Sequence, residues 1–110
     1  MKIAVVGSRT IKDVSLEEYI GGEAEEIVSG GAVGVDSCAA EYAKIKGLKL
    51  TEFLPEYKDY GRAAPIVRNK KIVDHADKVL VFWNGKSKGA LSVIDYAKKT
   101  GKPCEVILCE

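Results

Sequence analysis

The sequence has few of the residues that define disulfide-rich, metal-binding or membrane-spanning proteins. Its 110 residues include three cysteines and one histidine. The cysteines are odd in number and show neither a CxxC pair nor Cys/His ligand spacing, so we expect no disulfide framework and no metal. No apolar run approaches the roughly 20 residues of a membrane span. Met1-Lys2-Ile3 leads straight into a strand pattern rather than a signal peptide, which favours a cytoplasmic protein.

The scarce residues fit structural roles. Cys38 is expected on the buried side of a helix and Cys104 at the start of a strand, both as small core residues. His75 lies beside Asp74 and Asp77 at the end of a helical pattern. It is interpreted as a cation at a helix C-terminus.

A large excess of charge of one sign is also missing. The formal net charge is +1 and 46% of the residues are hydrophobic, which indicates one soluble globular domain over residues 1–110. Locally the charges are uneven: 13–26 holds six acids and no base, whereas 62–102 holds ten bases and three acids. Such asymmetry can mark a side that faces a polyanion, but solvated helix faces give the same count.

Short apolar runs alternate with helical patterns along the chain. Strands are predicted at 2–6, 25–28, 48–54, 78–82 and 104–108, and helices at 16–20, 35–46, 65–76 and 89–100. Ser15 and Glu18 are placed to cap the first of these helices. Residues 55–64 are expected to form a polar loop.

This alternation predicts an α/β fold, a three-layer Rossmann-like domain with a five-stranded parallel sheet and right-handed crossovers. The long connection at 55–66 marks the reversal of strand order, giving 3-2-1-4-5. Ligands of such open sheets bind beyond the carboxyl ends of the strands at the switch point. Four segments are expected to meet there: 7–9, 29–36, the region of Arg68, and 84–90.

The stretch SGGAVGVD, residues 29–36, lies between a strand and a helix. Such a turn leaves backbone N–H groups at the positive end of the helix, which suits an anion. Gly30, Gly31 and Gly34 allow positive φ and close approach of a ligand to the backbone. A plain tight turn would explain an isolated Gly-Gly equally well. The convergence of four segments favours the binding interpretation.

Four motifs carry a resemblance to a known family. VVGSR (5–9), SGGAVGVDSCAAEYA (29–43), RNKKIV (68–73) and KSKGALSVIDYAKKTGKP (86–103) resemble the SLOG superfamily of Rossmann-like domains. It includes the core of DNA-processing protein A (Smf), the Lonely-guy phosphoribohydrolases and the molybdenum-cofactor carrier proteins. The chain is most similar to the small stand-alone YspA/YpsA-like members, which implies binding or processing of a nucleotide-like ligand. No other cofactor is indicated.

The resemblance and the expected loops together give one set of candidate ligand-binding residues. It consists of Gly7, Ser8, Arg9, Ser29, Gly30, Gly31, Ala32, Gly34, Asp36, Arg68, Asn69, Lys86, Ser87, Gly89 and Ala90.

Several members of the set have more than one interpretation. Arg9 could pair with a phosphate or with Asp36, and the hydroxyls of Ser8 and Ser29 could reach anion oxygens. Asp36 could cap its helix and interact with the helix dipole, or hold a ribose hydroxyl or Arg9.

Arg68 and Asn69 resemble the Arg-Asn pair that family members direct into the pocket, although a solvated helix face is the alternative. Lys86 to Ala90 form a second glycine-containing loop that opens a helix. Trp83, Tyr57 and Tyr60 could stack on a base, but Trp83 could equally pack at the sheet edge.

The hydrolytic pattern of the family is incomplete here. Lonely-guy enzymes carry PGGxGTxxE, whereas this chain has KSKGALSVID, with Ala90 in place of the threonine. Glycosidic hydrolysis needs a carboxylate near the sugar, and Asp36 is the one obvious candidate, with Arg68 as its partner. We therefore expect a binding protein, with a nucleoside 5′-monophosphate phosphoribohydrolase as the alternative. A single-stranded nucleic-acid module is a second alternative, although aromatic residues are few in the basic half.

The shortness of the first helix suggests a partner. A helix of little more than one turn would leave the strand surface near Val5 and Ile27 thinly covered, beside Leu16, Tyr19 and Ile20. An exposed apolar patch of this kind often marks an interface. We therefore expect a homodimer or a larger homo-oligomer.

Overall fold

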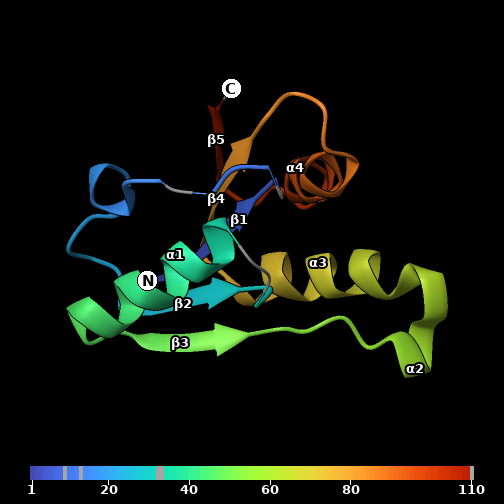
Figure 1. The fold of residues 1–110 in the computed structure, drawn as a ribbon, viewed down its shortest axis with the longest axis horizontal. Helices are drawn as coiled ribbons and strands as arrows, with labels where there is room; N and C mark the ends of the chain where they lie inside the picture. The colour runs from blue at the N-terminus through green and yellow to red at the C-terminus, as the bar shows by residue number, and fades with distance from the viewer. Residues whose placement is uncertain (9, 13, 32–33, 110) are drawn as a thin grey trace.

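Five parallel strands form one sheet in the computed structural model, which describes residues 1–8, 10–12, 14–31 and 34–109 (Figure 1). The strands are β1 (Lys2–Gly7), β2 (Glu26–Ser29), β3 (Lys49–Glu52), β4 (Lys78–Trp83) and β5 (Cys104–Leu108). Their order is β3-β2-β1-β4-β5. The predicted fold class and strand order are therefore confirmed.

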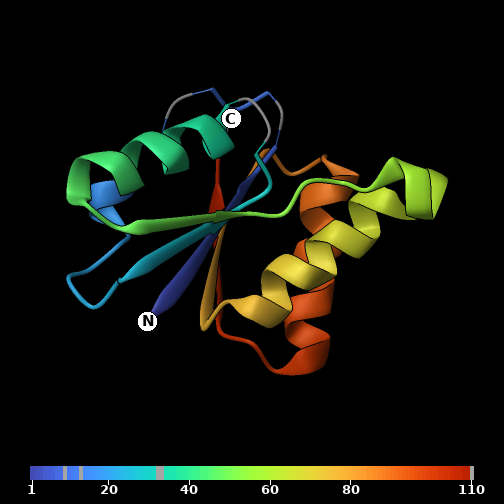
Figure 2. The same ribbon diagram turned by 90° about the horizontal axis from the view of Figure 1, so that it is seen from below.

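Helices cover both faces of this sheet. The longer ones are α1 (Val35–Lys46), α3 (Ala64–His75) and α4 (Lys88–Thr100), and shorter turns form η1 (Leu16–Glu18), α2 (Tyr57–Tyr60) and η2 (Gly61–Ala63). Figure 2 shows α1 on one face and α3 with α4 on the other, which makes three layers. None of the helices within the described ranges is long and apolar enough to cross a membrane.

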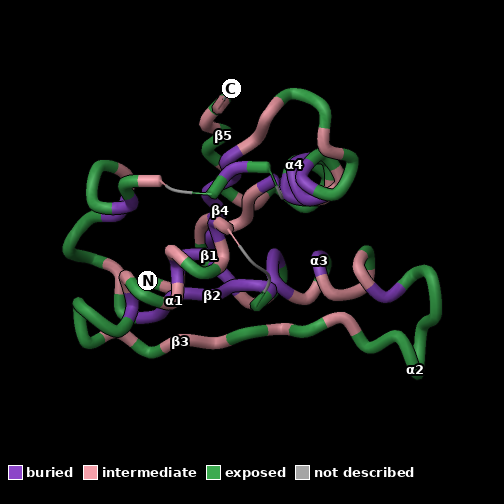
Figure 3. The backbone as a smooth tube through the Cα atoms, in the orientation of Figure 1, coloured by how far each residue is buried: buried purple, intermediate pink, exposed green. Residues whose placement is uncertain are grey.

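The core consists of two clusters, one on each face of the sheet. Leu80 and Phe82 point to the α1 side, whereas Val79 and Val81 point to the side of α3 and α4. The central strands are therefore buried on both faces, and most of their residues are coloured as buried in Figure 3. This is why their sequences are continuous apolar runs rather than alternating ones.

The segment after β3 differs from the prediction. β3 ends at Glu52 rather than at residue 54, and the expected polar loop contains α2 and η2. An ion pair of 2.8 Å between Glu56 and Lys71 ties this segment to α3, and the Lys71 ammonium lies 5.6 Å from the ring centre of Tyr60. Contacts between residues distant in sequence thus order a stretch that has no strong helical pattern.

The expected capping box at Ser15 is wrong. Ser15 holds the N-cap position of η1, but its side chain makes no capping hydrogen bond within the described part of the chain. η1 is a three-residue 3-10 turn, shorter than the predicted helix at 16–20. A turn this short has few of the unpaired N–H groups that make a cap worthwhile.

The predicted apolar patch near η1 is also wrong. Val5 and Ile27 are 0% exposed, Leu16 is 3% exposed, and Tyr19 packs edge-to-face on Phe82 with ring centres 5.4 Å apart. Ile11, which is in neither a helix nor a strand, belongs to the same buried cluster and helps to cover the sheet here. Because these residues form no exposed apolar patch, they give no support to an interface on this face.

The cysteines lie at the margin of the core. All three are described, partly buried and not in a disulfide. Cys38 packs against the cluster under α1 and Cys104 against the cluster under α3 and α4. The expected core placement thus holds for both, without full burial.

Gly7 allows α1 to approach the sheet closely. A Cβ atom at Gly7 would lie 2.4 Å from Val35 Cγ2, a distance that side chains essentially never reach. Gly7 ends β1 and Val35 begins α1. The glycine is therefore required by packing, whatever its role toward a ligand.

We predict that Gly7→Ala lowers the free energy of unfolding by about 1–3 kcal/mol, because the added methyl group overpacks the contact with Val35. Gly22→Ala is the matched control, since no described atom lies within 4 Å of a Cβ at that position. It should change stability by no more than about 0.5 kcal/mol. Urea unfolding of both variants measures the difference. Equal stabilities would contradict the close approach.

Candidate functional site

A cavity of about 140 Å³ lies at the carboxyl edge of the sheet, where the strand order reverses. It gathers the end of β1, the residue after β2, the starts of α1 and α4, and the N-terminal half of α3 with Ile72. Its lining residues are Val6, Gly7, Gly30, Asp36, Pro65, Arg68, Asn69, Ile72, Ser87, Gly89 and Ala90. More than half of the predicted ligand-binding set is thus brought together.

The rest of the predicted set is placed differently. Ser8, Ser29, Gly31, Gly34 and Lys86 are not among the described lining residues. Arg9 and Ala32 lie outside the described residues, so the predictions for them stay predictions.

The hydroxyls of Ser8 and Ser29 shape the loops around the cavity. Both residues are buried. Ser29 Oγ accepts a hydrogen bond from the Gly31 N–H at 3.3 Å, and Ser8 Oγ accepts one from the Asn84 N–H at 3.2 Å. Ser8 therefore joins the loop after β1 to the loop after β4.

The N-terminus of α1 is formed by glycine rather than by a capping side chain. Gly34 holds the N-cap position with φ of 80°, and Gly31 also has a positive φ of 71°. Gly31 and Gly34 therefore have the positive φ that was predicted, whereas Gly30 does not. Asp36 lies in the first turn, where its charge suits the helix dipole, and the N-cap position itself is held by Gly34.

The loop before α4 is held in one shape by its own hydrogen bonds. Asn84 Oδ1 accepts from the N–H groups of Lys86 and Ser87 at 2.9 and 2.8 Å. Ser87 is the N-cap, and its Oγ accepts from the Ala90 N–H at 3.3 Å. The indole Nε1 of Trp83 donates to the Ser87 carbonyl oxygen at 3.0 Å. Trp83 thus packs against the core and braces this loop, as its second interpretation expected.

Arg68 ties α3 to the ends of two strands. Its Nη1 donates to the carbonyl oxygens of Gly30 at 3.0 Å and of Phe53 at 3.4 Å. A Cβ atom at Gly30 would lie 2.5 Å from this nitrogen and 3.2 Å from Asp36 Oδ2. Arg68 and Asp36 therefore meet over Gly30, and the interpretation of Arg68 as part of a solvated face is wrong.

Asn69 positions Arg68 and links α3 to α4. The buried Asn69 accepts a hydrogen bond from Arg68 Nε at 2.9 Å and donates to Ser92 Oγ at 3.1 Å. Sequence reasoning missed Asn84 and Ser92 as supports of the site. An Asn next to a glycine is a turn signal that could have pointed to Asn84, whereas nothing local marks Ser92.

The aromatic residues of α2 do not contribute to the cavity wall. Tyr57 and Tyr60 are both exposed, and neither is among the described lining residues. Figures 1 and 2 show α2 extending beyond the sheet, next to the start of α3. The cavity therefore has no described aromatic platform for a base.

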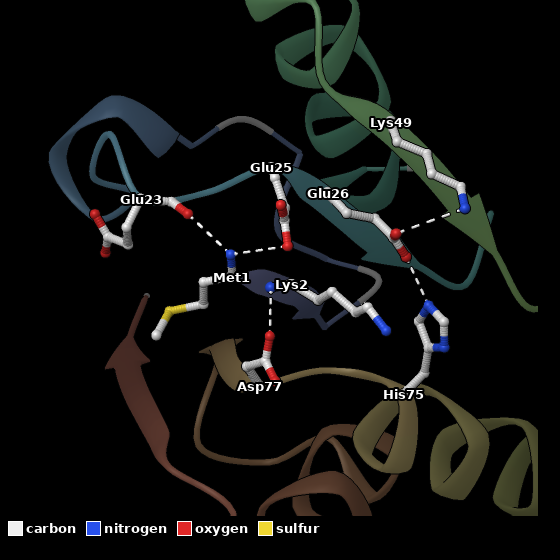
Figure 4. Close-up of polar contacts among 8 residues, drawn as sticks. All are labelled: Met1, Lys2, Glu23, Glu25, Glu26, Lys49, His75 and Asp77. Carbon is white, nitrogen blue, oxygen red and sulfur yellow. Dashed lines mark hydrogen bonds and ion pairs between the residues drawn. The ribbon is translucent and has the colours of Figure 1, made fainter.

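A second polar cluster lies at the opposite, amino edge of the sheet (Figure 4). The buried Glu26 begins β2, and its Oε2 lies 2.6 Å from His75 Nε2 and 2.9 Å from Thr51 Oγ1. Lys49 Nζ lies 3.7 Å from Oε1. Burial acts to raise the pKa of Glu26, but the hydrogen bonds from His75 and Thr51 and the charge of Lys49 hold it below its usual value.

His75 ends α3 as predicted, but its partner is Glu26 rather than a neighbouring aspartate. Asp74 accepts from the Tyr96 hydroxyl at 2.8 Å, and Asp77 accepts from the Lys2 N–H at 2.7 Å. No group of three or more His, Cys, Asp or Glu in the described ranges is arranged to hold a metal ion.

The fold and the cavity define a Rossmann-like α/β domain with a pocket of mixed polar and apolar lining at its topological switch point. Comparison of the chain with protein-family models gives no match, and comparison with curated proteins gives none either.

Glu26 makes the stability of the fold depend on pH. Its pKa is lowered in the folded state, so its contribution is fully present above the unfolded value of about 4.3 and is lost as pH falls through the folded value. We predict that Glu26→Gln lowers the free energy of unfolding at pH 7 by about 1–3 kcal/mol, because the amide loses the negative charge and replaces one of the two acceptor oxygens with an NH2 donor. The variant should also lose less stability than the parent below about pH 4.3.

Urea unfolding at a series of pH values measures both effects. Glu41→Gln, at an exposed position on α1, removes the same charge and is the matched control. An identical acid slope for Glu26→Gln and the parent would contradict the assignment.

Proposed function

We propose that this protein binds a small phosphate-bearing ligand, a nucleotide or a nucleotide derivative, in the cavity at the switch point. One observation carries the proposal: two helix N-termini and one arginine converge on a single cavity at the edge of the sheet where such folds bind ligands.

The start of α4 is the better prepared of the two helix ends. Ser87 accepts from the Ala90 N–H, which leaves the N–H groups of the first residues, Lys88 and Gly89, as those without an intrahelical acceptor. The Asn84 turn fixes their direction before any ligand arrives. Because an anion then meets N–H groups already oriented, little ordering cost accompanies binding.

Arg68 adds positive charge at a fixed place. Its Nη1 donates to two backbone carbonyl oxygens, those of Gly30 and Phe53, which hold the guanidinium in one orientation. Asp36 supplies the compensating carboxylate on the same side of Gly30. A ligand with a phosphate and neighbouring hydroxyl groups suits this pair, because the carboxylate accepts hydroxyl protons and the cation attracts the phosphate.

The size of the cavity limits how much of the ligand is enclosed. At about 140 Å³ it is smaller than the roughly 300–1,000 Å³ of typical small-molecule pockets. The phosphate-bearing end would therefore be enclosed and the remainder would extend outward. The resemblance of four motifs to the SLOG superfamily supports the same class of ligand.

A phosphoribohydrolase is the second candidate function. It is favoured by Asp36, the one carboxylate among the described lining residues, which lies beside Arg68. Such an enzyme would release the free base from a nucleoside 5′-monophosphate, with Asp36 next to the sugar. Asp36→Asn should then abolish release while binding persists.

We predict that a matching ligand raises the melting temperature. At 100 times its Kd a ligand adds about 2.7 kcal/mol of stability, a shift of several degrees for a domain of this size. The panel comprises nucleoside mono- and diphosphates, NAD, ADP-ribose and inorganic phosphate, with products followed by chromatography. Arg68→Ala should lose the shift, and Lys44→Ala, an equal charge change at the far end of α1, should keep it.

Because Arg68 also supports the fold, Arg68→Lys is a second variant that keeps the charge but loses the fork geometry. It should show an intermediate shift. No response to any ligand, or equal shifts in Arg68→Ala and the parent, would contradict the proposal. Oligonucleotide binding with steep salt dependence would instead favour a nucleic-acid module.

A further inference from the structure

The two edge strands of the sheet, β5 and β3, differ in how they are protected against pairing with another chain. β5 is one edge, and no other described strand pairs with its outer side. Val106 is 41% exposed and Leu108 is 69% exposed. An apolar edge strand of this kind offers unpaired backbone groups to another chain, and monomeric proteins usually protect such edges with charge, proline or a bulge.

β3, at the other edge, has this protection. It is a strand of four residues with exposed charged residues at both ends, Lys49 and Glu52. β5 has one charged residue, Glu105, whose Oε1 lies 3.5 Å from Lys78 Nζ of the neighbouring strand. Its charge is thus compensated within the protein, and the edge lacks the repulsion that would keep a partner away.

The hydrogen bonds to β4 show which backbone groups of β5 point outward. Val79 N–H donates to the Pro103 carbonyl oxygen at 2.9 Å, and Cys109 N–H donates to the Trp83 carbonyl oxygen at 2.7 Å. The backbone N–H and C=O groups of the odd-numbered residues in and beside β5 therefore point toward β4. Because direction alternates along a strand, the N–H and C=O groups of Cys104, Val106 and Leu108 face away from it.

We propose that β5 is a homodimer interface, at which a second copy of this chain adds its own β5 antiparallel about a two-fold axis through Val106. Val106 then lies opposite the partner's Val106, and Cys104 lies opposite the partner's Leu108. The three outward-facing residues on each side would form about six hydrogen bonds, because in an antiparallel ladder every second pair exchanges both. The result is one continuous sheet of ten strands, twice the five of one copy.

The side chains also favour a second copy as the occupant. On the α4 face the pairing joins apolar groups, since Val106 and Leu108 are in register with Val81 and Trp83. On the other face Glu105 lies opposite the partner's Ile107. No like charges are directly opposite each other, which would be destabilising. The strand is thus complementary to itself.

The interface is separate from the cavity. None of the residues of β5 is among the described lining residues of the cavity. The cavity lies at the carboxyl ends of the strands. Because the strands of the two copies would run in opposite directions, the two cavities would lie on opposite sides of the joined sheet. Failure of the dimer and failure of ligand binding are therefore distinguishable.

Sedimentation analysis over a wide concentration range tests the assembly. The parent chain should dimerise, and Val106→Lys should weaken dimerisation by at least about tenfold, because two lysines would meet at the axis. Val106→Thr keeps a β-branched side chain and should retain most of the association. Ile45→Lys, at an exposed apolar position on α1, is the matched control and should have no effect. A monomeric parent, or a dimer lost only in Ile45→Lys, would overturn the proposal.

Crosslinking tests the register without relying on a destabilised variant. In a chain whose three native cysteines are serines, Val106→Cys should form a disulfide dimer on mild oxidation. Paired residues of this kind have Cα atoms about 5.5 Å apart, within the disulfide range of about 4.4–6.8 Å. Glu105→Cys, which faces the partner's Ile107, should crosslink far less. Equal crosslinking of the two variants would overturn the two-fold pairing at Val106.

Discussion

The hydrogen bonds of Arg68 are the constraint on which the carboxyl edge of the sheet depends. They join α3 to the carbonyl ends of β2 and β3 at Gly30 and Phe53. Asn69 accepts from Arg68 Nε and so fixes the direction of the Arg68 side chain, and it also donates to Ser92 on α4. Since the guanidinium already serves these carbonyls, an incoming anion would be held chiefly by the N–H groups of the helix starts. Arg68 would act mainly through its charge, as a fixed source of positive potential.

Two glycines make room for this arrangement in different ways. Gly7 lets Val35, at the start of α1, approach the end of β1, and Gly30 lets Arg68 and Asp36 lie over the chain after β2. Neither has a positive φ, so what they provide is space rather than an unusual backbone. Gly7 is the last residue of β1 and Gly30 is the first residue after β2, and both line the cavity.

The strand order and much of the cavity could be predicted because they follow from local patterns. Buried runs such as residues 78–82 mark the central strands, and the long connection before Pro65 marks the reversal. The predictions failed where contacts between residues distant in sequence determine the structure. Ile11 covers the sheet from an irregular segment that has no periodicity, and the bond from Asn69 to Ser92 depends on how two helices pack. Sequence spacing carries no signal for either contact.

The Glu26 cluster shows why a perturbed carboxylate need not mark a functional site. Glu26 is buried and its pKa is shifted, features that also occur in active sites. Its partners are His75 and Thr51, which already hold it in the folded chain. The cluster also lies at the amino edge, away from the strand ends where this fold binds ligands. At the carboxyl edge, by contrast, the N–H of Gly89 in the first turn of α4 has no intrahelical acceptor and Gly89 lines the cavity, which is why the proposed ligand site is placed there.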